Sequence, residues 1–401
     1  MKKTNIIFKS LGVAAFALSA LTFSSCLGDG DDTIILENGS SLGIPSDNLA
    51  DAAPEVTEPT VTLPNAVCTL VQENGSAVMN IDMTGVWNKN EGDWMNLYGT
   101  AYKGHGQNVW VTVDGKPKGI DVYNNSENEG REILTDVVFL VDNSGSMSEE
   151  AEAIARDIKD WAEKLGKSGL SVRFGCVGYG DSYHAIDGAL NVTTAEKLKE
   201  YLDADSRYGT SRTHYYGGSD AADLQRKAEG GNYENGSYNE CGMVALHFAN
   251  DNFTFRQGAN RIYVNFTDEP NQPNRGSKWS VEFLNPTTNP TNWNPANGTV
   301  HTVYSGYQQS SWTAYEENPA LMSEYTGGTV LYATSRFTDL NTGEAVTLES
   351  LPVTGAMQNS YIIRFTNVEE YMDGQPHEVK VTVVSADGTV RAEKIYWVIF
   401  Q

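Results

Sequence analysis

Basic residues are scarce in this sequence. Its 401 residues include 28 Lys and Arg against 52 Asp and Glu, which gives a formal net charge of −24. Proteins that bind nucleic acid need a positive surface for phosphate, so this balance argues against a nucleic-acid partner. Hydrophobic residues make up 40% of the chain and aromatic residues 10%, enough to bury a core. The composition therefore indicates a globular protein, and the length favours more than one domain.

Cysteine and histidine are scarce as well. The chain has 4 Cys and 6 His, with no CxxC pair and no HxxxH or HxH spacing. This scarcity excludes a disulfide scaffold and the common zinc sites. The cysteines are Cys26, Cys68, Cys176 and Cys241, and if Cys26 is modified the other three allow at most one disulfide.

Apolar runs long enough to span a bilayer are absent. Residues 11–23 are mostly apolar but too few for a stable membrane-spanning helix, and Lys2, Lys3 and Lys9 come before them. A basic start followed by a short apolar run is typical of an export signal, which we place at residues 1–25. The chain is therefore expected to be secreted.

The end of this signal resembles that of a bacterial lipoprotein. Ser24 and Ser25 precede Cys26, although Phe23 stands where an aliphatic residue is usual. The resemblance implies lipidation of Cys26 and anchoring at the bacterial outer membrane or cell surface. An ordinary signal peptide followed by an unrelated cysteine is the alternative. Residues 26–60 are acidic, without Lys or Arg, and predict a flexible tether that acts as a plain linker or as a surface-export tag.

Residues 61–130 and 335–401 share a β-strand texture. Short runs alternate apolar and polar residues, as in 108–113 and 379–384, and Asp-Gly turns follow them. Neither flank alone is long enough for a comfortable β-sandwich, but together they offer about the number of strands that one needs. We therefore predict that the flanks pair in a β-sandwich-like domain, with the middle of the chain inserted between them.

The middle of the chain, residues 131–334, alternates buried-strand runs with helical periodicity. Residues 136–141 are apolar after the first, as in a strand covered on both faces, and an amphipathic helical pattern follows at 148–165. Further strands are predicted at 170–178, 261–267, 300–304 and 329–333, and further helices at 194–202, 241–250 and 318–325. This α/β pattern predicts a doubly wound, mainly parallel sheet with helices on both faces and right-handed crossovers.

Two of these strands end in polar clusters. Asp142, Ser144 and Ser146 follow the first strand, and Asp268 follows the strand at 261–267. In a doubly wound fold the working site lies beyond the carboxyl ends of the strands, near the point where the strand order reverses. An all-oxygen set of this kind suits a hard divalent cation, Mg²⁺ or Ca²⁺.

At this point the sequence resembles a von Willebrand factor type A (vWA) domain. DNSGSM at 142–147 is similar to the family's DxSxS metal-ion-dependent adhesion site. The Thr-Asp pair at 267–268 is similar to its second aspartate position, and ENPALMSEYTGGTV at 317–330 to its last helix and strand. The resemblance covers about half of the chain and implies a vWA, Rossmann-like fold.

The resemblance also implies roles for the four residues. Both serines would bind a metal directly through their hydroxyls, and both aspartates would act mostly through metal-bound water. The family's Thr before the third core helix is missing here, and Tyr238 stands nearest to that position. Ser237, Asn239, Glu240 or water could supply the oxygen instead.

These expectations lead to a function. A metal held mainly by neutral hydroxyls keeps much of its positive charge and an open coordination position, which a partner's carboxylate can fill. We therefore expect an adhesin-like surface lipoprotein, not an enzyme, that binds a protein or glycan offering a carboxylate. The alternative is a structural component of a pilus tip or surface complex, with a structural or degenerate metal site.

A catalytic interpretation is weaker. Gly180-Asp181-Ser182 resembles the nucleophile block of a lipase and esterase family, and Asp373 and His377 resemble its partner pair. In that family the block follows the first strand near the mature start. Here the preceding strand is already a core strand of the predicted α/β domain, so we do not favour this interpretation.

Overall fold

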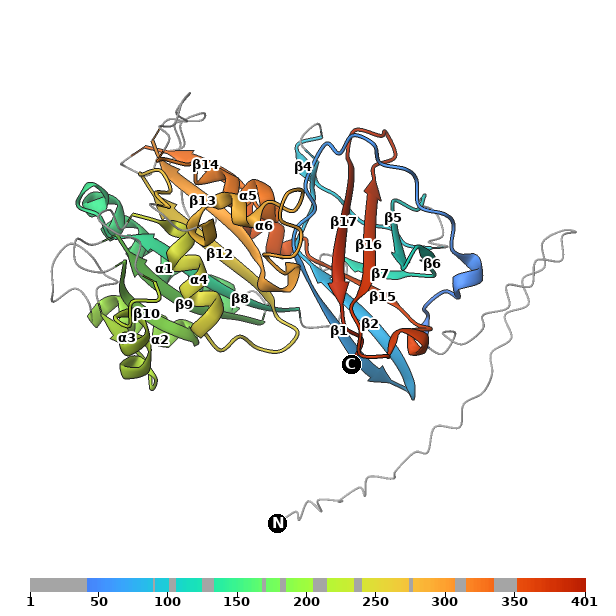
Figure 1. Cartoon of the computed structure of the whole chain (residues 1–401), viewed down its shortest axis with the longest axis horizontal. Coiled ribbons are helices and arrows are strands. Elements are labelled where there is room, and N and C mark those ends of the chain that lie inside the picture. The colour runs from blue at the N-terminus through green and yellow to red at the C-terminus, as the bar shows by residue number, and fades with distance from the viewer. Residues whose placement is uncertain are drawn as a thin grey trace, which may run out of the picture. The chain divides into compact units, whose positions relative to one another are not determined.

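The computed structural model describes residues 42–88, 91–100, 106–124, 133–167, 171–180, 185–204, 215–233, 240–273, 277–306, 315–334 and 352–401. The predicted export signal, Cys26, Ser182 and Tyr238 lie outside these ranges. Within them, the chain forms an α/β body and a flanking β-structure (Figure 1).

The α/β body is built on a seven-stranded sheet. Its strands are β8 (Leu134–Asp142), β9 (Ser171–Tyr179), β10 (Ile186–Thr193), β11 (Tyr216–Gly217), β12 (Asn260–Thr267), β13 (Thr299–Ser305) and β14 (Val330–Ala333). They lie in the order β11-β10-β9-β8-β12-β13-β14, and all neighbours are parallel except β9 and β10. The predicted mainly parallel sheet is confirmed. The antiparallel strand β10 escaped prediction because Asp187 and Gly188 interrupt its apolar run.

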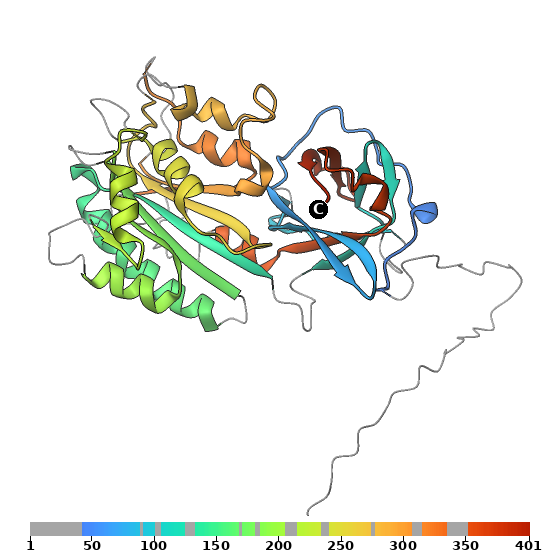
Figure 2. The same ribbon diagram turned by 60° about the horizontal axis from the view of Figure 1, so that its bottom comes forward.

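Helices cover both faces of this sheet because its central strands are apolar on both sides. Val137, Phe139 and Val141 of β8 belong to one core, and Val138 and Leu140 to the other. Helices α1 (Ser148–Lys167), α2 (Ala195–Ala204) and α6 (Pro352–Gln358) contribute to the first core. Helices α3 (Ala221–Ala228), α4 (Gly242–Asn252) and α5 (Ala320–Thr326) contribute to the second. Figure 2 shows the sheet between these two layers.

Helix α6 lies in the segment 335–401, for which the sequence predicts only β-structure. Its Val353 and Met357 join the core beneath α1, and Trp161 Nε1 donates to Thr354 Oγ1 at 2.9 Å. Short 3-10 helices are η2 (Asp47–Leu49), η4 (Gly145–Met147), η6 (Ser277–Trp279), η7 (Val281–Leu284), η8 (Pro295–Asn297) and η9 (Glu369–Tyr371). Among the helices of the described ranges, none is long and apolar enough to cross a membrane.

The flanking β-structure joins strands from both ends of the chain. One sheet runs β1 (Ala66–Glu73), β2 (Ser76–Met83), β15 (Tyr361–Phe365), β7 (Asp121–Asn124). A second runs β17 (Arg391–Val398), β16 (His377–Val384), β5 (Val109–Val113), β6 (Lys116–Lys118), and β3 (Trp87–Asn88) pairs separately with β4 (Asp93–Trp94). Alternate apolar residues of both four-stranded sheets fill one common core. Strands from either side of the inserted body therefore share each of these two sheets.

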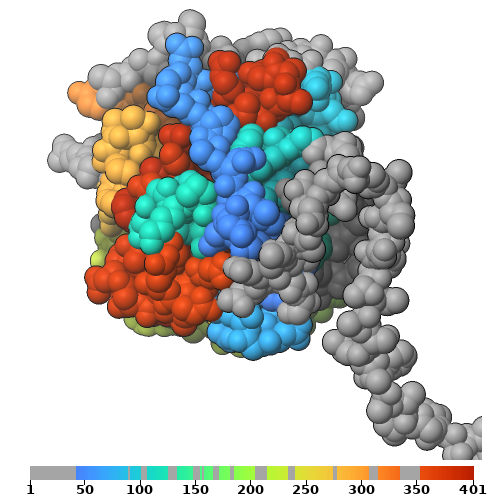
Figure 3. All heavy atoms as spheres, turned by 90° about the vertical axis from the view of Figure 1, so that its right-hand side faces the viewer, coloured from blue at the N-terminus to red at the C-terminus, as the bar shows by residue number. Residues whose placement is uncertain are grey.

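Residues 42–64 lie against the β-structure. The almost fully buried Lys118 donates from Nζ to Asp47 Oδ2 at 2.6 Å, and Thr60 N donates to Arg391 O at 2.8 Å. Residues 42–60, the C-terminal part of the predicted flexible tether, therefore pack against the β-structure. Figure 3 shows this segment, in blue, crossing one face of the β-structure.

Candidate metal centre

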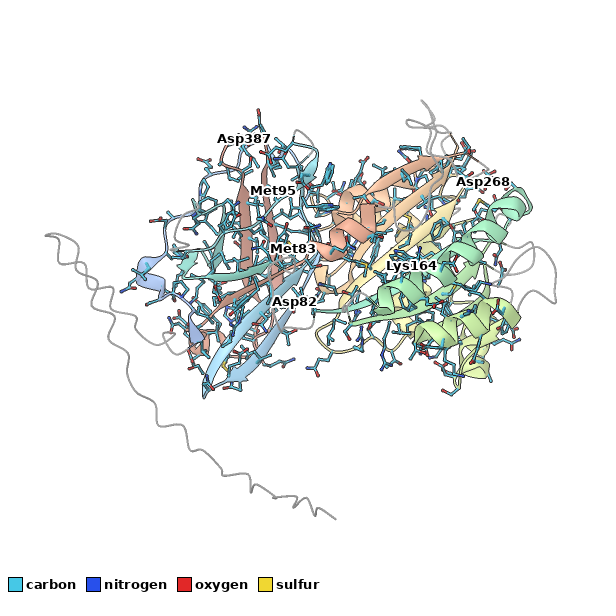
Figure 4. The ribbon with its side chains drawn as sticks, turned by 180° about the vertical axis from the view of Figure 1, so that it is seen from behind. Asp82, Met83, Met95, Lys164, Asp268 and Asp387 are labelled. Atoms are coloured by element: carbon cyan, nitrogen blue, oxygen red, sulfur yellow. The ribbon has the colours of Figure 1, made fainter. Side chains whose placement is uncertain are left out.

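The predicted site lies at the carboxyl ends of β8 and β12. These strands are neighbours in the middle of the sheet, and the strand order reverses between them, since β9 follows on one side and β13 on the other. Asp142 is the last residue of β8, and Asp268 directly follows β12. Figure 4 labels Asp268 at this end of the strands. Because the two strands are parallel, both aspartates stand at the same edge of the sheet.

Asp142 is fully buried and held by two hydrogen bonds. Its Oδ1 accepts the N–H of Ser144 at 2.9 Å, and its Oδ2 accepts the hydroxyl of Thr267 at 2.8 Å. Gly180 packs against the carboxylate, since a Cβ there would lie 2.7 Å from Asp142 Oδ1 and the residue has φ +98°. Burial nevertheless raises the pKa of Asp142 to about 7, and the charge of Asp268 adds to the rise.

The two serines and Asp268 form a chain of close contacts. Ser144 Oγ lies 3.0 Å from Ser146 Oγ, and Ser146 Oγ donates to Asp268 Oδ1 at 3.2 Å. The turn that carries the serines is anchored by Met147, which is buried in the core and donates from its N–H to Ser144 O at 3.1 Å. The structure thus brings together Asp142, Ser144, Ser146 and Asp268 from two loops that are far apart in the sequence.

Two further carboxylates stand close to this set. Burial raises the pKa of Glu269 to about 7, and the charges of Glu240 and Asp268 contribute. Burial, followed by the charge of Asp268, also raises the pKa of Glu240, and burial raises that of Asp268 itself. No Lys or Arg of the described chain offsets Asp142, Asp268, Glu240 or Glu269. Among the described residues, this edge of the sheet therefore carries an excess of negative charge.

Sequence reasoning did not select Thr267, Gly180 or Glu269. The Thr267 hydroxyl donates to Asp142 and accepts the N–H of Glu269 at 3.1 Å, so one side chain joins the two loops. A polar residue at the last position of a buried strand is the signal that could have revealed it. Tyr238 lies outside the described residues. Glu240, one of its alternatives, is described and lies near enough to Asp268 for their charges to interact.

The donor set fits a hard divalent cation. It consists of oxygens only, two from hydroxyls and the rest from carboxylates, which is the chemistry that Mg²⁺ and Ca²⁺ prefer. In the part of the chain that the structure describes, no group of three or more His, Cys, Asp or Glu side chains is arranged for a metal ion. The candidate set differs in kind because serine hydroxyls are essential members.

The remaining candidates do not join this site. Among the described residues, Cys68, Cys176 and Cys241 form no disulfide, and burial raises the pKa of Cys241 to about 12. His377 and Asp373 do contact each other, at 3.0 Å between Nε2 and Oδ1, but they belong to the β-structure.

A family model for the von Willebrand factor type A domain matches residues 136–282. This stretch runs from β8 into η7 and contains all four candidate ligands. The seven-stranded sheet agrees with this match. No curated protein matches the chain.

Solved structures resemble the chain distantly. The pilus adhesin SpaC from Lactobacillus rhamnosus GG, in its open conformation, is 10% identical with a TM-score of 0.34, and the alignment covers 83% of this chain and 55% of SpaC. The human COPII-coat protein Sec24c is 10% identical with a TM-score of 0.31, over 88% of this chain and 64% of Sec24c. The chain thus spans about half the length of SpaC. These likenesses are too distant to carry an argument about function.

Proposed function

We propose that the chain binds a carboxylate-bearing protein or glycan through a divalent cation, Mg²⁺ or Ca²⁺, held by Asp142, Ser144, Ser146 and Asp268. One observation carries the proposal: the contacts of 3.0 Å and 3.2 Å that link Ser144 Oγ, Ser146 Oγ and Asp268 Oδ1. The vWA match over the same residues supports it. The proposal is a binding function, not catalysis.

The serines and the aspartates of the site have different roles in the proposed cation binding. The serines offer neutral oxygens, whereas Asp142 and Asp268 offer negative charge. Ser144 N–H and Thr267 Oγ1 fix the Asp142 carboxylate before any ion arrives, which lowers the cost of ordering the site. When bound, the cation supplies a positive centre with room for one more oxygen ligand. On a chain of net charge −24 such a centre would be the natural contact for a partner's carboxylate.

We place this binding at the bacterial outer membrane or cell surface, through a lipid on Cys26. The support is the basic, apolar and small-residue pattern of residues 1–26. Cys26→Ala should move the protein from the membrane fraction to the soluble fraction and abolish labelling by a radioactive fatty acid. Unchanged fractionation and labelling would contradict the anchor.

The binding function can be tested with a defined acidic surface. Beads coated with polygalacturonic acid should retain the wild-type protein in Mg²⁺ or Ca²⁺ and release it in EDTA. The matched control is the same polymer with its carboxylates amidated, which should retain nothing. Asp142→Asn should behave like the wild type in EDTA. Retention that ignores the chelator or the amidation would contradict the proposal.

The nearby carboxylates favour a second candidate function. Glu240 and Glu269 crowd the site with further oxygens, which could fill the open position of an ion. The ion would then be structural, and the chain would serve as an assembly component of a pilus tip or surface complex through other faces. In that case a divalent cation would stabilise the protein, yet assembly with its partner subunit would survive in a variant such as Asp268→Asn.

A further inference from the structure

A cavity lies at the other end of the sheet, where the α/β body meets the β-structure. It has a volume of about 430 Å³, within the range of small-molecule sites. His301, near the start of β13, and Thr329, just before β14, form part of its lining. These residues stand at the amino ends of the strands, whereas Asp142 and Asp268 stand at the carboxyl ends. The cavity is therefore separate from the candidate metal centre.

Two residues of the cavity lining, His301 and Thr84, carry side-chain atoms without a hydrogen-bond partner in the described chain. His301 Nδ1 accepts the N–H of Thr329 at 3.1 Å and lies 2.7 Å from Thr329 Oγ1. Because the backbone N–H can only donate, Nδ1 is the acceptor and the ring carries its proton on Nε2. That Nε2–H donor is buried and has no partner in the described chain, and the same holds for Thr84 Oγ1. Burial lowers the pKa of His301 to about 3, which keeps the ring neutral. Two residues of one cavity lining thus carry a buried polar atom without a partner, which favours a ligand that forms hydrogen bonds.

The same cavity has an aromatic wall. Trp87 is 40% exposed and meets Trp94 edge to face, with ring centroids 5.1 Å apart. Trp94 is wedged between Gly85 and Gly355, where an added Cβ would come within 2.7 Å and 2.4 Å of its ring. The inner Trp94 is therefore fixed, and it supports the outer Trp87, which is open to a ligand.

Residues next to the lining also tie the segments that form the cavity to each other. Asn65 donates from Nδ2 to Gly298 O at 2.6 Å and from its N–H to Thr299 Oγ1 at 3.1 Å. Gly327, which has φ +79° after α5, approaches Leu63 O so closely that a Cβ would lie 2.3 Å from it. A cavity held in this way is preformed, and a ligand would not have to order it.

We propose that this cavity binds a neutral saccharide unit. Glu324 lines it, whereas no Lys or Arg does among the described residues, so an anionic ligand would be repelled. A simple cation offers no acceptor to the His301 N–H, and an apolar ligand satisfies neither orphaned atom. A sugar ring presents an apolar C–H face to the exposed indole of Trp87, and its hydroxyls both donate and accept hydrogen bonds.

The test is saturation-transfer NMR and calorimetry with glucose, galactose, mannose, N-acetylglucosamine, lactose and cellobiose. At least one should bind the wild type with a Kd of about 0.1 to 10 mM, as expected for a small site with few hydrogen bonds. Trp87→Ala should weaken binding about tenfold or more, and the near-isosteric Thr84→Val about threefold. Trp397→Ala removes a comparably exposed tryptophan outside the cavity and should change nothing.

Two controls separate this proposal from the proposed metal site. Binding should persist in EDTA and in Asp142→Asn, so a failure of the metal site leaves this proposal standing. Choline, as a cationic probe, should not compete with the sugar. The proposal is overturned if no sugar of the panel binds, if Trp87→Ala binds as well as the wild type, or if choline displaces the sugar.

Discussion

In two regions of the described chain, the pKa values of neighbouring acidic side chains move in opposite directions. At the carboxyl ends of β8 and β12, burial raises the pKa of Asp142 to about 7 and raises that of Asp268. In the β-structure the pKa of Asp114 is lowered, mainly by a hydrogen bond from His377. The pKa of Asp373 is lowered too, first by a backbone N–H and then by His377.

The two regions differ because, in the described chain, only the β-structure places a basic side chain, His377, beside its acids. His377 Nδ1 lies 2.7 Å from Asp114 Oδ2, and its Nε2 lies 3.0 Å from Asp373 Oδ1. The contact with Asp114 is the largest cause of the raised pKa of His377. The sheet edge has serine hydroxyls where the β-structure has an imidazolium. Among the described residues, His377 offsets the acidic side chains of one region, and no Lys or Arg offsets those of the other, where we propose a divalent cation.

Removing one uncompensated charge should give the largest effect. In EDTA at pH 8, Asp142→Asn should raise the free energy of unfolding by up to about 4 kcal/mol, because a pKa raised from 3.8 to about 7 corresponds to roughly that cost for the ionised form. The amide can keep both hydrogen bonds, by accepting from Ser144 N–H and donating to Thr267 Oγ1. Urea unfolding measures the difference.

The pH dependence has a definite sign. Folded Asp142 keeps its proton to a higher pH than the unfolded chain does, so its contribution to stability is lost as the pH rises from about 4 through 7. Asp142→Asn should lack this loss. The matched control is Asp114→Asn, which removes a compensated charge and should destabilise. If Asp142→Asn is less stable than the wild type in EDTA at pH 8, the ionised Asp142 carboxylate does not destabilise the folded protein, and the prediction fails.

A bound divalent cation should offset the free-energy cost of the buried, ionised Asp142 carboxylate. Mg²⁺, Ca²⁺ or Mn²⁺ at about a hundred times its Kd should add roughly 2.7 kcal/mol to the free energy of unfolding of the wild type. The reason is that the ion binds the folded site and not the unfolded chain. Thermal unfolding with and without each ion measures the gain. Ser146→Ala should lose most of it, and an equal gain in that variant would place the ion elsewhere.

The His377 contacts should give a smaller effect of their own. Their contribution is present below pH 6.5 and is lost as the pH rises through the raised pKa of folded His377. Both aspartates are well exposed, so solvent limits the effect to about 1 kcal/mol or less. His377→Gln should remove this pH dependence without changing the response to divalent cations. An NMR titration that places the pKa of His377 below 6.5 would contradict the claim that Asp114 and Asp373 stabilise its protonated form.

The smallest effect is expected at Glu269. Because this side chain is half-buried, Glu269→Gln should stabilise the protein in EDTA by less than about 1 kcal/mol at pH 8. It should also weaken divalent-cation binding by a few-fold, because one nearby negative charge is lost. Urea unfolding in EDTA measures the change in stability, and calorimetric titration of the variant and the wild type measures the change in cation affinity. Tighter binding in the variant would show that Glu269 hinders the ion.

Much of the α/β body was predictable from the sequence because its strands are apolar on both faces. Residues 136–141 and 261–267 both read as buried strands, and parallel neighbours bring their carboxyl ends to one edge. That rule alone placed Ser144, Ser146 and Asp268 near one another. Strand β10 lacks such a run, because Asp187 and Gly188 interrupt it, and was not predicted.

The supporting parts of the site were less predictable because they depend on contacts across the sheet. Thr267 reads as the last residue of a strand, and only the structure shows its hydroxyl on Asp142. In the sequence, Gly180 looks like an ordinary turn glycine. In the structure it leaves room for the Asp142 carboxylate, because a Cβ at this position would lie 2.7 Å from Asp142 Oδ1. The pairing of His377 with Asp114 joins residues 263 positions apart and has no local signal.

Calorimetric titration of Mn²⁺, Mg²⁺ and Ca²⁺ into the wild-type protein and Asp142→Asn at pH 6.5 tests the central claim most directly. We predict one ion per chain for the wild type, together with release of protons because the pKa of Asp142 is near 7 without the ion, and no binding to Asp142→Asn. The absence of binding to the wild type, or equal binding to both proteins, would contradict it.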